Sequence, residues 1–507
     1  MICFSQLQSP IGNIAVQLNP MSKRATIIGS GIAGLAASIR LALKGHAVEV
    51  FEANSYPGGK LSEIELRGYR FDAGPSLFTL PDQVEELFML AGRNPADHFE
   101  YLRLPVACHY FWEDGKRLKA YSDLDAFSAE VESVLGEPAS HVREALRKSA
   151  FIYDHLAPLF MHRSLHKLGT WTNPQALRSY LKMGKLGIFS TMNGANESQF
   201  NHPKLIQLFN RYATYNGSNP YQTPGTLNII PHLEFNIGAF FPKKGMHDIS
   251  QSLYKLSKEL GVKYYFGEKV DEILVENGRA TGIRIGKKTH PADLVVTNMD
   301  MVNAYKTILR NQKQPKKLLD QPKSSSALIF YWGINKNFPE LDLHNILFSE
   351  NYREEFDHIF KKGTITQDPT VYINITSVYK SDDAPQDCMN WFTMINVPNN
   401  QGQDWDQLIG EARKNIIQKL NRILKTDIES LIEVEDILDP RTIESRTSSA
   451  QGALYGNSSN NMFAAFLRHA NFSSSIKNLY FCGGSVHPGG GIPLCLLSAK
   501  IMSEMIE

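Results

Sequence analysis

Hydrophobic positions near the start of the chain switch from a strand-like to a helix-like pattern and back. An apolar run at 25–28 predicts a strand, and apolar residues at helical spacing over 35–43 predict a helix that ends at Gly45. A second apolar run at 48–52 predicts another strand. Strand, helix and strand within about 30 residues form a βαβ unit, which begins a parallel sheet.

The same alternation returns later in the chain. Helical spacing over 249–260 precedes a strand at 262–266, and a hairpin turn at 276–279 joins two further strand-like runs. The C-terminus repeats strand, glycine-rich turn and helix. These later strands and helices are expected at 270–275, 280–285, 293–297, 479–482 and 494–506.

Two other regions separate these elements. Residues 125–235 have mainly helical patterns, whereas 324–400 contain strand runs at 327–332, 371–375 and 391–395, which an amphipathic helix at 405–423 is expected to cover. We therefore predict an α/β plus α+β fold, in which a Rossmann-like nucleotide-binding domain in discontinuous segments receives an inserted substrate domain of mixed sheet and helices. The predicted segments are 21–107, 236–305 and 471–507 for the first domain, and 108–235 and 306–470 for the second.

Composition agrees with a folded chain of two or three domains. The 507 residues are 42% hydrophobic and 21% charged, which excludes disordered and fibrous classes. The net charge of +1 gives no reason to expect nucleic acid as a partner. No run of about 18 apolar residues occurs, so we expect no membrane-spanning helix.

The cysteines indicate the redox compartment of the protein, and the first residues indicate where its natural sequence starts. Five cysteines at irregular spacings predict free thiols in a reducing compartment, and no cluster has the spacing of a metal site. Residues 1–20 lack the features of a signal peptide, and Met21 followed by Ser-Lys-Arg is typical of a natural start. We interpret 1–20 as a leader or other upstream extension.

The strongest chemical motif is Gly29-Ser30-Gly31-Ile32-Ala33-Gly34, between the first strand and the first helix. Gly29 allows a tight turn, Gly31 lets a pyrophosphate approach the backbone, and Gly34 lets helix and strand pack closely. Glu52 ends the next strand, where a carboxylate binds ribose hydroxyls. A tight turn with a chance acid is the alternative, and NAD would be the rival cofactor for this motif alone.

A second glycine pair indicates the cofactor. Pro57-Gly58-Gly59-Lys60-Leu61-Ser62 follows Glu52, and here the chain resembles the superfamily of flavin-containing amine oxidases and phytoene desaturases. Members of that superfamily usually carry Arg where this chain has Lys60, and Lys offers phosphate a point charge rather than a bidentate fork. The resemblance implies FAD as cofactor.

The tail extends the resemblance to the bacterial carotenoid desaturases. It contains Cys482-Gly483-Gly484-Ser485-Val486-His487-Pro488 and then Gly491-Ile492-Pro493, and segments 210–224 and 452–456 are similar too. In this superfamily the tail closes over the flavin, with a helix N-terminus facing the ring. The region around Lys60 is most similar to the 1-hydroxycarotenoid 3,4-desaturase branch.

Motifs and resemblance together assign residues to the cofactor. Val270 is expected to meet the adenine through its backbone, and Ser76 and Leu77 to lie near the isoalloxazine. His487 is the one nominated catalytic base, although a glycine-rich turn can also retain a His for backbone hydrogen bonds. The expected FAD contacts are Gly29, Gly31, Ile32, Ala33, Gly34, Glu52, Ala53, Gly58, Gly59, Lys60, Leu61, Ser76, Leu77, Val270, Asn298, Gly483, Gly484, Gly491 and Ile492.

The segment His155–Asn196 indicates a membrane surface as partner. It has no acidic residue, and cations are interleaved with aromatic and aliphatic residues, a pattern typical of interfacial helices. A solvated helical face is the alternative. We expect a peripheral protein on the cytoplasmic face of a membrane. The cations are Arg163, Lys167, Arg178, Lys182 and Lys185.

The function that the resemblance implies is FAD-dependent desaturation of an acyclic carotenoid, by hydride transfer to flavin, with 3,4-desaturation of a hydroxycarotenoid favoured. Oxygen or a quinone would accept the electrons. Aromatic residues of the strand runs, namely Phe330, Tyr331, Trp332, Trp391 and Phe392, are candidates to line a substrate tunnel, or equally to pack a core. The alternatives are a phytoene or neurosporene desaturase, a carotenoid isomerase and, in another class, a flavin-free lipid-binding carrier.

Overall fold

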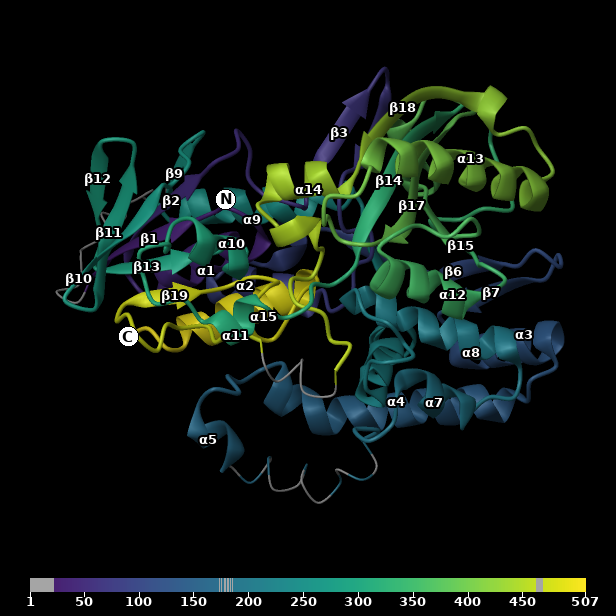
Figure 1. The fold of residues 1–507 in the computed structure, drawn as a ribbon, viewed down its shortest axis with the longest axis horizontal. Helices are drawn as coiled ribbons and strands as arrows, with labels where there is room; N and C mark the ends of the chain where they lie inside the picture. The colour runs from purple at the N-terminus through teal and green to yellow at the C-terminus, as the bar shows by residue number, and fades with distance from the viewer. Residues whose placement is uncertain are drawn as a thin grey trace, which may run out of the picture.

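The fold is described from a computed structural model, which covers residues 22–172, 174, 176, 179, 182, 184, 186–461 and 468–507. Two sheets dominate it and lie on opposite sides of the molecule, with a layer of helices beneath the second (Figure 1). None of the described helices is both long and apolar enough to span a bilayer. The predicted leader 1–20 lies outside the described residues.

The first sheet has five parallel strands in the order β19-β13-β1-β2-β9, so strands from both ends of the chain belong to one sheet, with β13 between β19 and β1. Most of these strands are short apolar runs, as expected of a sheet that is covered on both faces. The predicted Rossmann-like fold is confirmed. The strands are β1 (Arg24–Ile28), β2 (Ala47–Glu52), β9 (Lys263–Phe266), β13 (Leu294–Thr297) and β19 (Leu479–Phe481).

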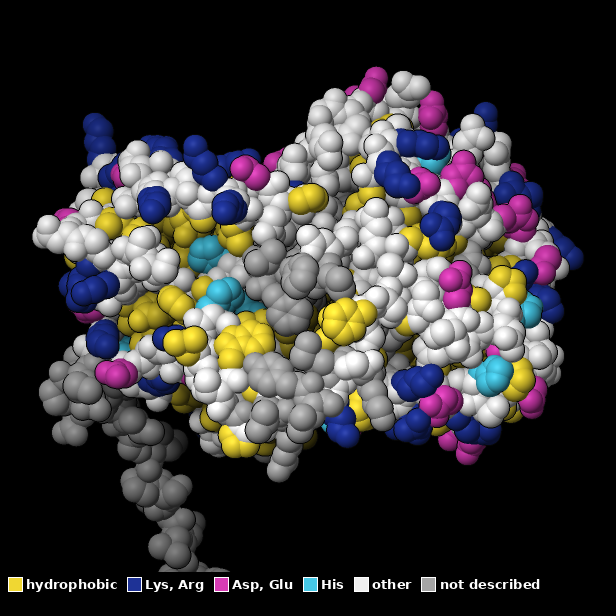
Figure 2. All heavy atoms as spheres, turned by 60° about the horizontal axis from the view of Figure 1, so that its bottom comes forward, with side chains coloured by type: hydrophobic (Ala, Val, Ile, Leu, Met, Phe, Trp, Pro, Cys, Tyr) yellow, Lys and Arg dark blue, Asp and Glu magenta, His cyan; other side chains and the backbone are white. Residues whose placement is uncertain are grey.

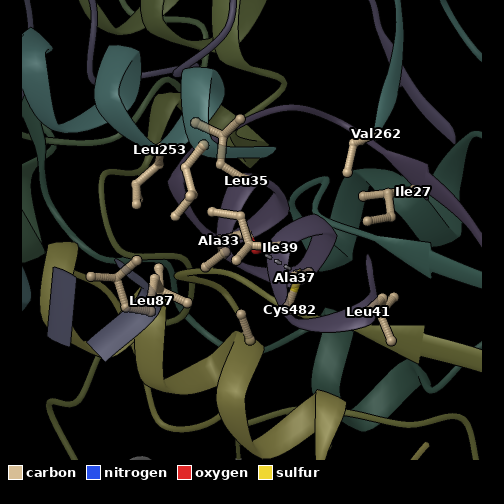
Figure 3. Packing of buried hydrophobic residues seen from close by; sticks show 14 of the residues in the cluster. Ile27, Ala33, Leu35, Ala37, Ile39, Leu41, Leu87, Leu253, Val262 and Cys482 are labelled. Atoms are coloured by element: carbon tan, nitrogen blue, oxygen red, sulfur yellow. Dashed lines mark hydrogen bonds between the residues drawn. The ribbon is translucent and has the colours of Figure 1, made fainter. Parts of the chain in front are cut away.

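Helix α1 (Ile32–Leu43) lies at the centre of this domain. It packs against α9 (His247–Glu259), α15 (Ile492–Ser503) and α2 (Asp82–Leu90). Leu35 and Ile39 are fully buried among residues of these helices and the sheet (Figure 3). Burying each such side chain contributes about 1.5–3 kcal/mol, so the helix that carries the glycine motif is firmly held.

A small antiparallel sheet follows, of β10 (Glu272–Glu276), β11 (Arg279–Ile285) and β12 (Lys288–Pro291). Asn277 and Gly278 have φ of 50° and 71° in its first turn. Positive φ at both central residues is the requirement of a two-residue hairpin turn, and Asn-Gly meets it at low cost. The hairpin predicted from the sequence is present.

The second sheet is mixed and has seven strands in the order β18-β14-β17-β16-β15-β6-β7. Helix α13 (Trp405–Leu424) packs through Trp405, Ile416 and Leu420 against residues from one face of this sheet. The strands are β6 (Val106–Phe111), β7 (Arg117–Tyr121), β14 (Ser326–Ile334), β15 (His344–Leu347), β16 (Val371–Asn374), β17 (Met389–Val397) and β18 (Ile432–Leu438).

The helical layer and the connecting elements complete the fold. The predicted limit between 107 and 108 lies within β6, which belongs to the second sheet, and the domain limits themselves stay a prediction. The remaining helices are α3 (Leu124–Leu135), α4 (Ala139–Phe160), α5 (Leu168–Trp171), α7 (Met192–Glu197), α8 (Pro203–Asn210), α10 (Met301–Lys306), α11 (Lys316–Leu319), α12 (Tyr352–Asp357) and α14 (Pro440–Thr447), and the remaining strands β3 (Glu63–Leu66), β4 (Tyr69–Asp72), β5 (Tyr101–Arg103) and β8 (Phe240–Pro242).

Candidate active site

A cavity of about 1710 Å³ lies between the two sheets. Pockets for one drug-sized ligand measure about 300–1,000 Å³, so this cavity has room for two ligands or one very long one. Its wall runs from the glycine motif and the end of β2, past Ser76, to the second sheet and helix α4. The end of the wall at the glycine motif is therefore polar backbone, whereas the end at the second sheet and α4 consists largely of side chains.

The glycine motif forms the first part of this wall. Gly29 has φ of +94°, a conformation that favours glycine. A Cβ on Gly31 would lie 2.7 Å from Asn298 Oδ1, and a Cβ on Gly34 would overlap the carbonyl oxygen of Gly29. The backbone at the N-terminus of α1 is thus left open to an anion, since only glycine fits these positions.

The second glycine pair lies directly against the first. The amide of Gly58 donates to the carbonyl oxygen of Ser30 over 2.8 Å, and a Cβ on Gly59 would lie 3.3 Å from the Cα of Gly31. Gly58 and Gly59 have φ of +109° and +59°. The two motifs therefore form one continuous stretch of side-chain-free backbone along the cavity.

Glu52 stands where β2 ends, beside this stretch. Its Oε2 accepts hydrogen bonds from the amide and hydroxyl of Ser30, at 2.7 and 2.9 Å. Its Oε1 accepts from the amide of Asn54 at 2.9 Å. The carboxylate is buried and held in place at the cavity wall, where Ala53 follows it. This is the place of the ribose-binding acid in a dinucleotide site.

Charged side chains border the same region. Lys60 donates from Nζ to the carbonyl oxygen of Leu454 over 2.9 Å. Burial lowers the pKa of Lys60, and the charge of Asp300 opposes that shift. Burial likewise raises the pKa of Asp300 and lowers that of Arg468 to about 10. Asp300 and Arg468 were not among the residues assigned from the sequence, because no local motif marks them as charges that face a ligand.

The C-terminal segment closes the wall. Gly491 precedes the first residue of α15, and Gly484, Gly491 and Ile492 line the cavity. A Cβ on Gly483 would lie 2.6 Å from Asn298 Nδ2. The positive end of the α15 dipole therefore faces the cavity, where it favours a negatively charged group.

The structure brings together most of the residues expected to bind the cofactor. Gly34 and Gly483 are not part of the described cavity wall, and instead allow close backbone packing behind it. The members that line the cavity are Gly29, Gly31, Ile32, Ala33, Glu52, Ala53, Gly58, Gly59, Lys60, Leu61, Ser76, Leu77, Val270, Asn298, Gly484, Gly491 and Ile492.

His487 lies behind the cavity wall rather than in it. Its Nε2 lies 2.8 Å from the carbonyl oxygen of Arg163, to which it donates, and its ring contacts those of Phe160 and His166. The side chain is 1% exposed, and burial lowers its pKa to about 4. This position ties the tail to the helical layer, and its catalytic role stays a prediction that the geometry does not favour.

The second sheet forms the opposite wall. Side chains alternate between the two faces of a strand. Tyr331 and Phe392 line the cavity, whereas Phe330, Trp332 and Trp391 pack in the cluster beneath α13. The candidate tunnel residues thus divide by strand face, a division that the sequence run alone did not provide.

A buried polar cluster interrupts this apolar wall at Arg211. The guanidinium donates to Tyr215 and Tyr110 at 2.6 and 2.7 Å. Glu234 accepts from Arg211, Tyr212 and Tyr215. The ion pair is 5% and 2% exposed and is surrounded by hydroxyl partners. The segment 210–224, noted for its resemblance, contains Arg211, Tyr212 and Tyr215, but no motif linked them to Glu234.

A family model described as flavin-containing amine oxidoreductase matches residues 32–506. The chain belongs to the flavin-containing amine oxidoreductase family. It is 53% identical to a 1-hydroxycarotenoid 3,4-desaturase of Flavobacterium sp. (strain P99-3) over 96% of this chain and 99% of that protein. It is 30% identical to a 4,4'-diapolycopene oxygenase of Methylomonas sp over 96% and 98%.

Solved structures have the same fold. An oxidoreductase from Methanosarcina mazei superposes with a TM-score of 0.61 at 17% identity, covering 96% of this chain and 100% of that one. The fold shared with this flavoprotein family therefore extends over almost the whole chain.

FAD fits the cavity of this family member. The joined glycine stretch leaves room for a pyrophosphate, and Glu52 is placed for a ribose. A dinucleotide site in a flavin-containing family identifies the cofactor as FAD. The residues that would hold it are those of the cavity wall from Gly29 to Lys60, with Val270 and Ile492.

Proposed function

We propose that this chain is an FAD-dependent carotenoid desaturase that introduces a C=C bond between carbons 3 and 4 of an acyclic hydroxycarotenoid. The 53% identity with a 1-hydroxycarotenoid 3,4-desaturase over nearly the full length of both chains carries the proposal. The size of the cavity supports it, because FAD and part of a long polyene fit together in about 1710 Å³.

The reaction removes a hydride from one carbon and a proton from its neighbour, and the new double bond forms between them. The bound flavin supplies the hydride acceptor. The chain's own part is to exclude water and to hold the polyene, through apolar residues such as Tyr331, Phe392 and Ile346. Aromatic faces also favour positive charge on the polyene as the hydride leaves.

The reaction also needs an acceptor for the electrons of the flavin and an acceptor for the proton. A two-electron acceptor has to reoxidise the flavin, and we propose oxygen or a membrane quinone. A proton acceptor is needed as well. Burial lowers the pKa of His487 to about 4, which makes this histidine a weak base near neutral pH.

The assay uses the protein with FAD in liposomes that carry either phytoene or a 1-hydroxy acyclic carotenoid, under air and with added quinone. Each new conjugated double bond moves the polyene absorbance to the red. A shift with the hydroxylated substrate alone supports 3,4-desaturation. A shift with phytoene alone contradicts it in favour of a phytoene-type desaturase, and no shift with either contradicts desaturation.

We further propose that the segment 155–196 docks on a membrane. Leu168 and Phe189 are 85% and 75% exposed, although both are large and apolar. Leu156 and Phe160, at the start of this segment and the end of helix α4, line the cavity. Figure 2 shows apolar side chains on this underside, with Lys and Arg as well as Asp and Glu towards its margin. A substrate could thus pass from lipid to the cavity past this segment. Of the cations in the segment, Arg178 and Lys185 lie outside the described residues.

Flotation with anionic liposomes tests the docking proposal. Leu168→Ser combined with Phe189→Ser removes two exposed apolar side chains, and we expect the bound fraction to fall several-fold while flavin content stays unchanged. Val378→Ser is the matched control, since Val378 is 40% exposed on another part of the molecule. Equal binding of the double variant and the control would contradict the proposal.

A further inference from the structure

Three polar side chains, linked in series by hydrogen bonds, cross the apolar wall of the cavity. Ser76 Oγ lies 2.8 Å from the Tyr372 hydroxyl oxygen, which lies 2.7 Å from His344 Nδ1. All three residues line the cavity. Strand register explains the second contact: His344 is opposite Asn374 and Ile346 is opposite Tyr372, so His344 and Tyr372 are diagonal neighbours across β15 and β16.

The hydrogen bonds among these three residues are ordered from donor to acceptor, and the neighbouring Asn374 indicates the order. Asn374 Nδ2 donates to the carbonyl oxygen of Leu343 at 3.0 Å and lies 3.3 Å from His344 Nδ1. Because Asn374 Nδ2 can only donate, we assign His344 Nδ1 as the acceptor and the Tyr372 hydroxyl as its donor. The Ser76 hydroxyl then donates to the Tyr372 oxygen. The lone pairs of Ser76 Oγ are left to accept a hydrogen bond from a group outside this series of three residues.

The charge state of His344 keeps this direction. Burial and the nearby Arg211 charge lower the pKa of His344 to about 3. The imidazole is therefore neutral near pH 7, and with Nδ1 assigned as the acceptor its proton is on Nε2. Nε2 is buried and has no hydrogen-bond partner in the described part of the chain. Hydrogen bonds in series polarise one another, so the acceptor strength of Ser76 depends on both partners.

A hydroxyl on carbon 1 needs a partner close to the bond that reacts. The oxygen on carbon 1 is three bonds from carbon 3, a distance of about 4 Å at most at ~1.5 Å per bond. Its partner must therefore stand beside the bond that reacts. Ser76 follows Gly74, where a Cβ would overlap the carbonyl oxygen of Lys60, so the segment packs against the cofactor side of the cavity.

The other polar cluster of the wall is a weaker candidate. Arg211 and Glu234 are already paired with each other and with Tyr215. An open polar atom of that cluster is Arg211 Nε, which is buried without a partner among the described residues and can only donate. Ser76 Oγ instead offers lone pairs that its own bond to Tyr372 leaves open.

We propose that Ser76 Oγ accepts a hydrogen bond from the hydroxyl of the carotenoid and so selects hydroxylated substrates, with Tyr372 and His344 as positioning residues that orient Ser76. This inference rests on the proposed function. A polyene that lacks the hydroxyl leaves the acceptor of Ser76 unpaired in a water-free cavity, which disfavours its binding.

The test compares two substrates in one preparation of the FAD-loaded enzyme. One is a 1-hydroxy acyclic carotenoid, and the other has the same conjugated length but no hydroxyl. The ratio of their kcat/KM values does not depend on the fraction of folded protein. Ser76→Ala should lower kcat/KM for the hydroxylated substrate about 10–100-fold more than for the substrate without the hydroxyl.

Further variants separate recognition from structure. Ser76→Thr keeps the hydroxyl and should retain the preference, whereas Tyr372→Phe should lower it about 3–10-fold by freeing Ser76 to rotate. Tyr305→Phe is the matched control. Tyr305 also bonds a buried histidine, His469 at 3.0 Å, and neither residue lines the described cavity. This variant should not change the ratio.

The outcomes distinguish the inference from the function. Wild-type enzyme that desaturates both substrates equally, or Ser76→Ala that loses activity equally with both, would overturn the recognition by Ser76 and leave the desaturase in place. Wild-type enzyme that desaturates neither substrate would overturn the proposed function and this inference with it.

Discussion

At the scale of single residues, Gly58 combines two constraints. Its φ of +109° favours glycine, and a Cβ there would lie 2.5 Å from the carbonyl oxygen of Leu61 and 2.8 Å from Ser250 Oγ. The residue thus brings the second glycine pair against the first. Any side chain at this point would move the backbone that faces the cofactor.

We expect Gly58→Ala to abolish or strongly reduce FAD binding. The ratio of flavin to protein absorbance in the purified variant measures this. Gly45→Ala is the matched control, since Gly45 has φ of +85° but no atom within 4 Å of a Cβ. The control isolates the backbone strain, about 1–2 kcal/mol, from the overlap. Full flavin content in Gly58→Ala would contradict the role of this position.

His487 predicts a pH dependence of stability. Burial holds its folded-state pKa at about 4, below the 6.5 of an exposed histidine. The unfolded chain therefore binds this proton first. The contribution to the free energy of unfolding is complete above pH 6.5 and is lost as the pH falls towards 4, by up to about 1.4 kcal/mol per pH unit.

Thermal unfolding of wild type and His487→Gln between pH 7 and 4 measures this effect. The variant should lose less stability than wild type on acidification, because it has no proton to bind at this position. A variant that keeps most of its kcat would also separate this structural role from that of a base. Parallel pH profiles of the two proteins would show that His487 does not titrate as described.

At the scale of elements, the second sheet serves the site with one face and the core with the other. On β14, Ala327, Ile329 and Tyr331 line the cavity, and the alternate residues Phe330 and Trp332 pack towards α13. The strand period of two residues makes this division. Stability and substrate contact are thereby separated on the same strand.

Because the two faces are separate, we expect that truncating a side chain in the core beneath α13 lowers stability without changing flavin content or kcat. Ile416 of α13 is fully buried, so Ile416→Ala should lower the free energy of unfolding by about 2–5 kcal/mol. Flavin content and kcat below the unfolding transition should not change. Ile423→Ala, at a partly buried position of the same helix, should cost less. A loss of flavin in Ile416→Ala would show that the two faces are coupled.

At the scale of the whole molecule, the cofactor site exists only when distant segments meet. Gly31 and Gly58 are joined by a β-bridge, and Asn298 and Gly483 meet behind the same wall. FAD that contacts the early motifs, Val270 and Ile492 would therefore hold three segments of the chain together. A ligand that binds only the native state stabilises it by mass action.

We expect added FAD to raise the melting temperature of protein from which flavin has been removed. At free FAD about 100-fold above its dissociation constant, the gain is about 2.7 kcal/mol. A thermal scan over a series of FAD concentrations measures it. Bound flavin without any shift of the melting temperature would contradict a site assembled from several segments.

The local elements and the dinucleotide motifs follow from the order of the residues alone. Short apolar runs, glycines at Gly29 and Gly58, and the acid Glu52 act through backbone geometry over a few residues, and such geometry can be read from spacing. For this reason the pattern predicts the strands at 25–28 and 48–52, and it indicates the expected cofactor residues near them.

Which side chains face the cavity depends on how the folded segments pack in space. Arg211 meets Glu234 from 23 residues away and His344 meets Tyr372 from a neighbouring strand, whereas Ser76 meets Tyr372 across 296 residues of the sequence. The same packing places His487 behind the wall. Their hydrogen bonds depend on sheet register and on packing between segments, and no local pattern of residues encodes either.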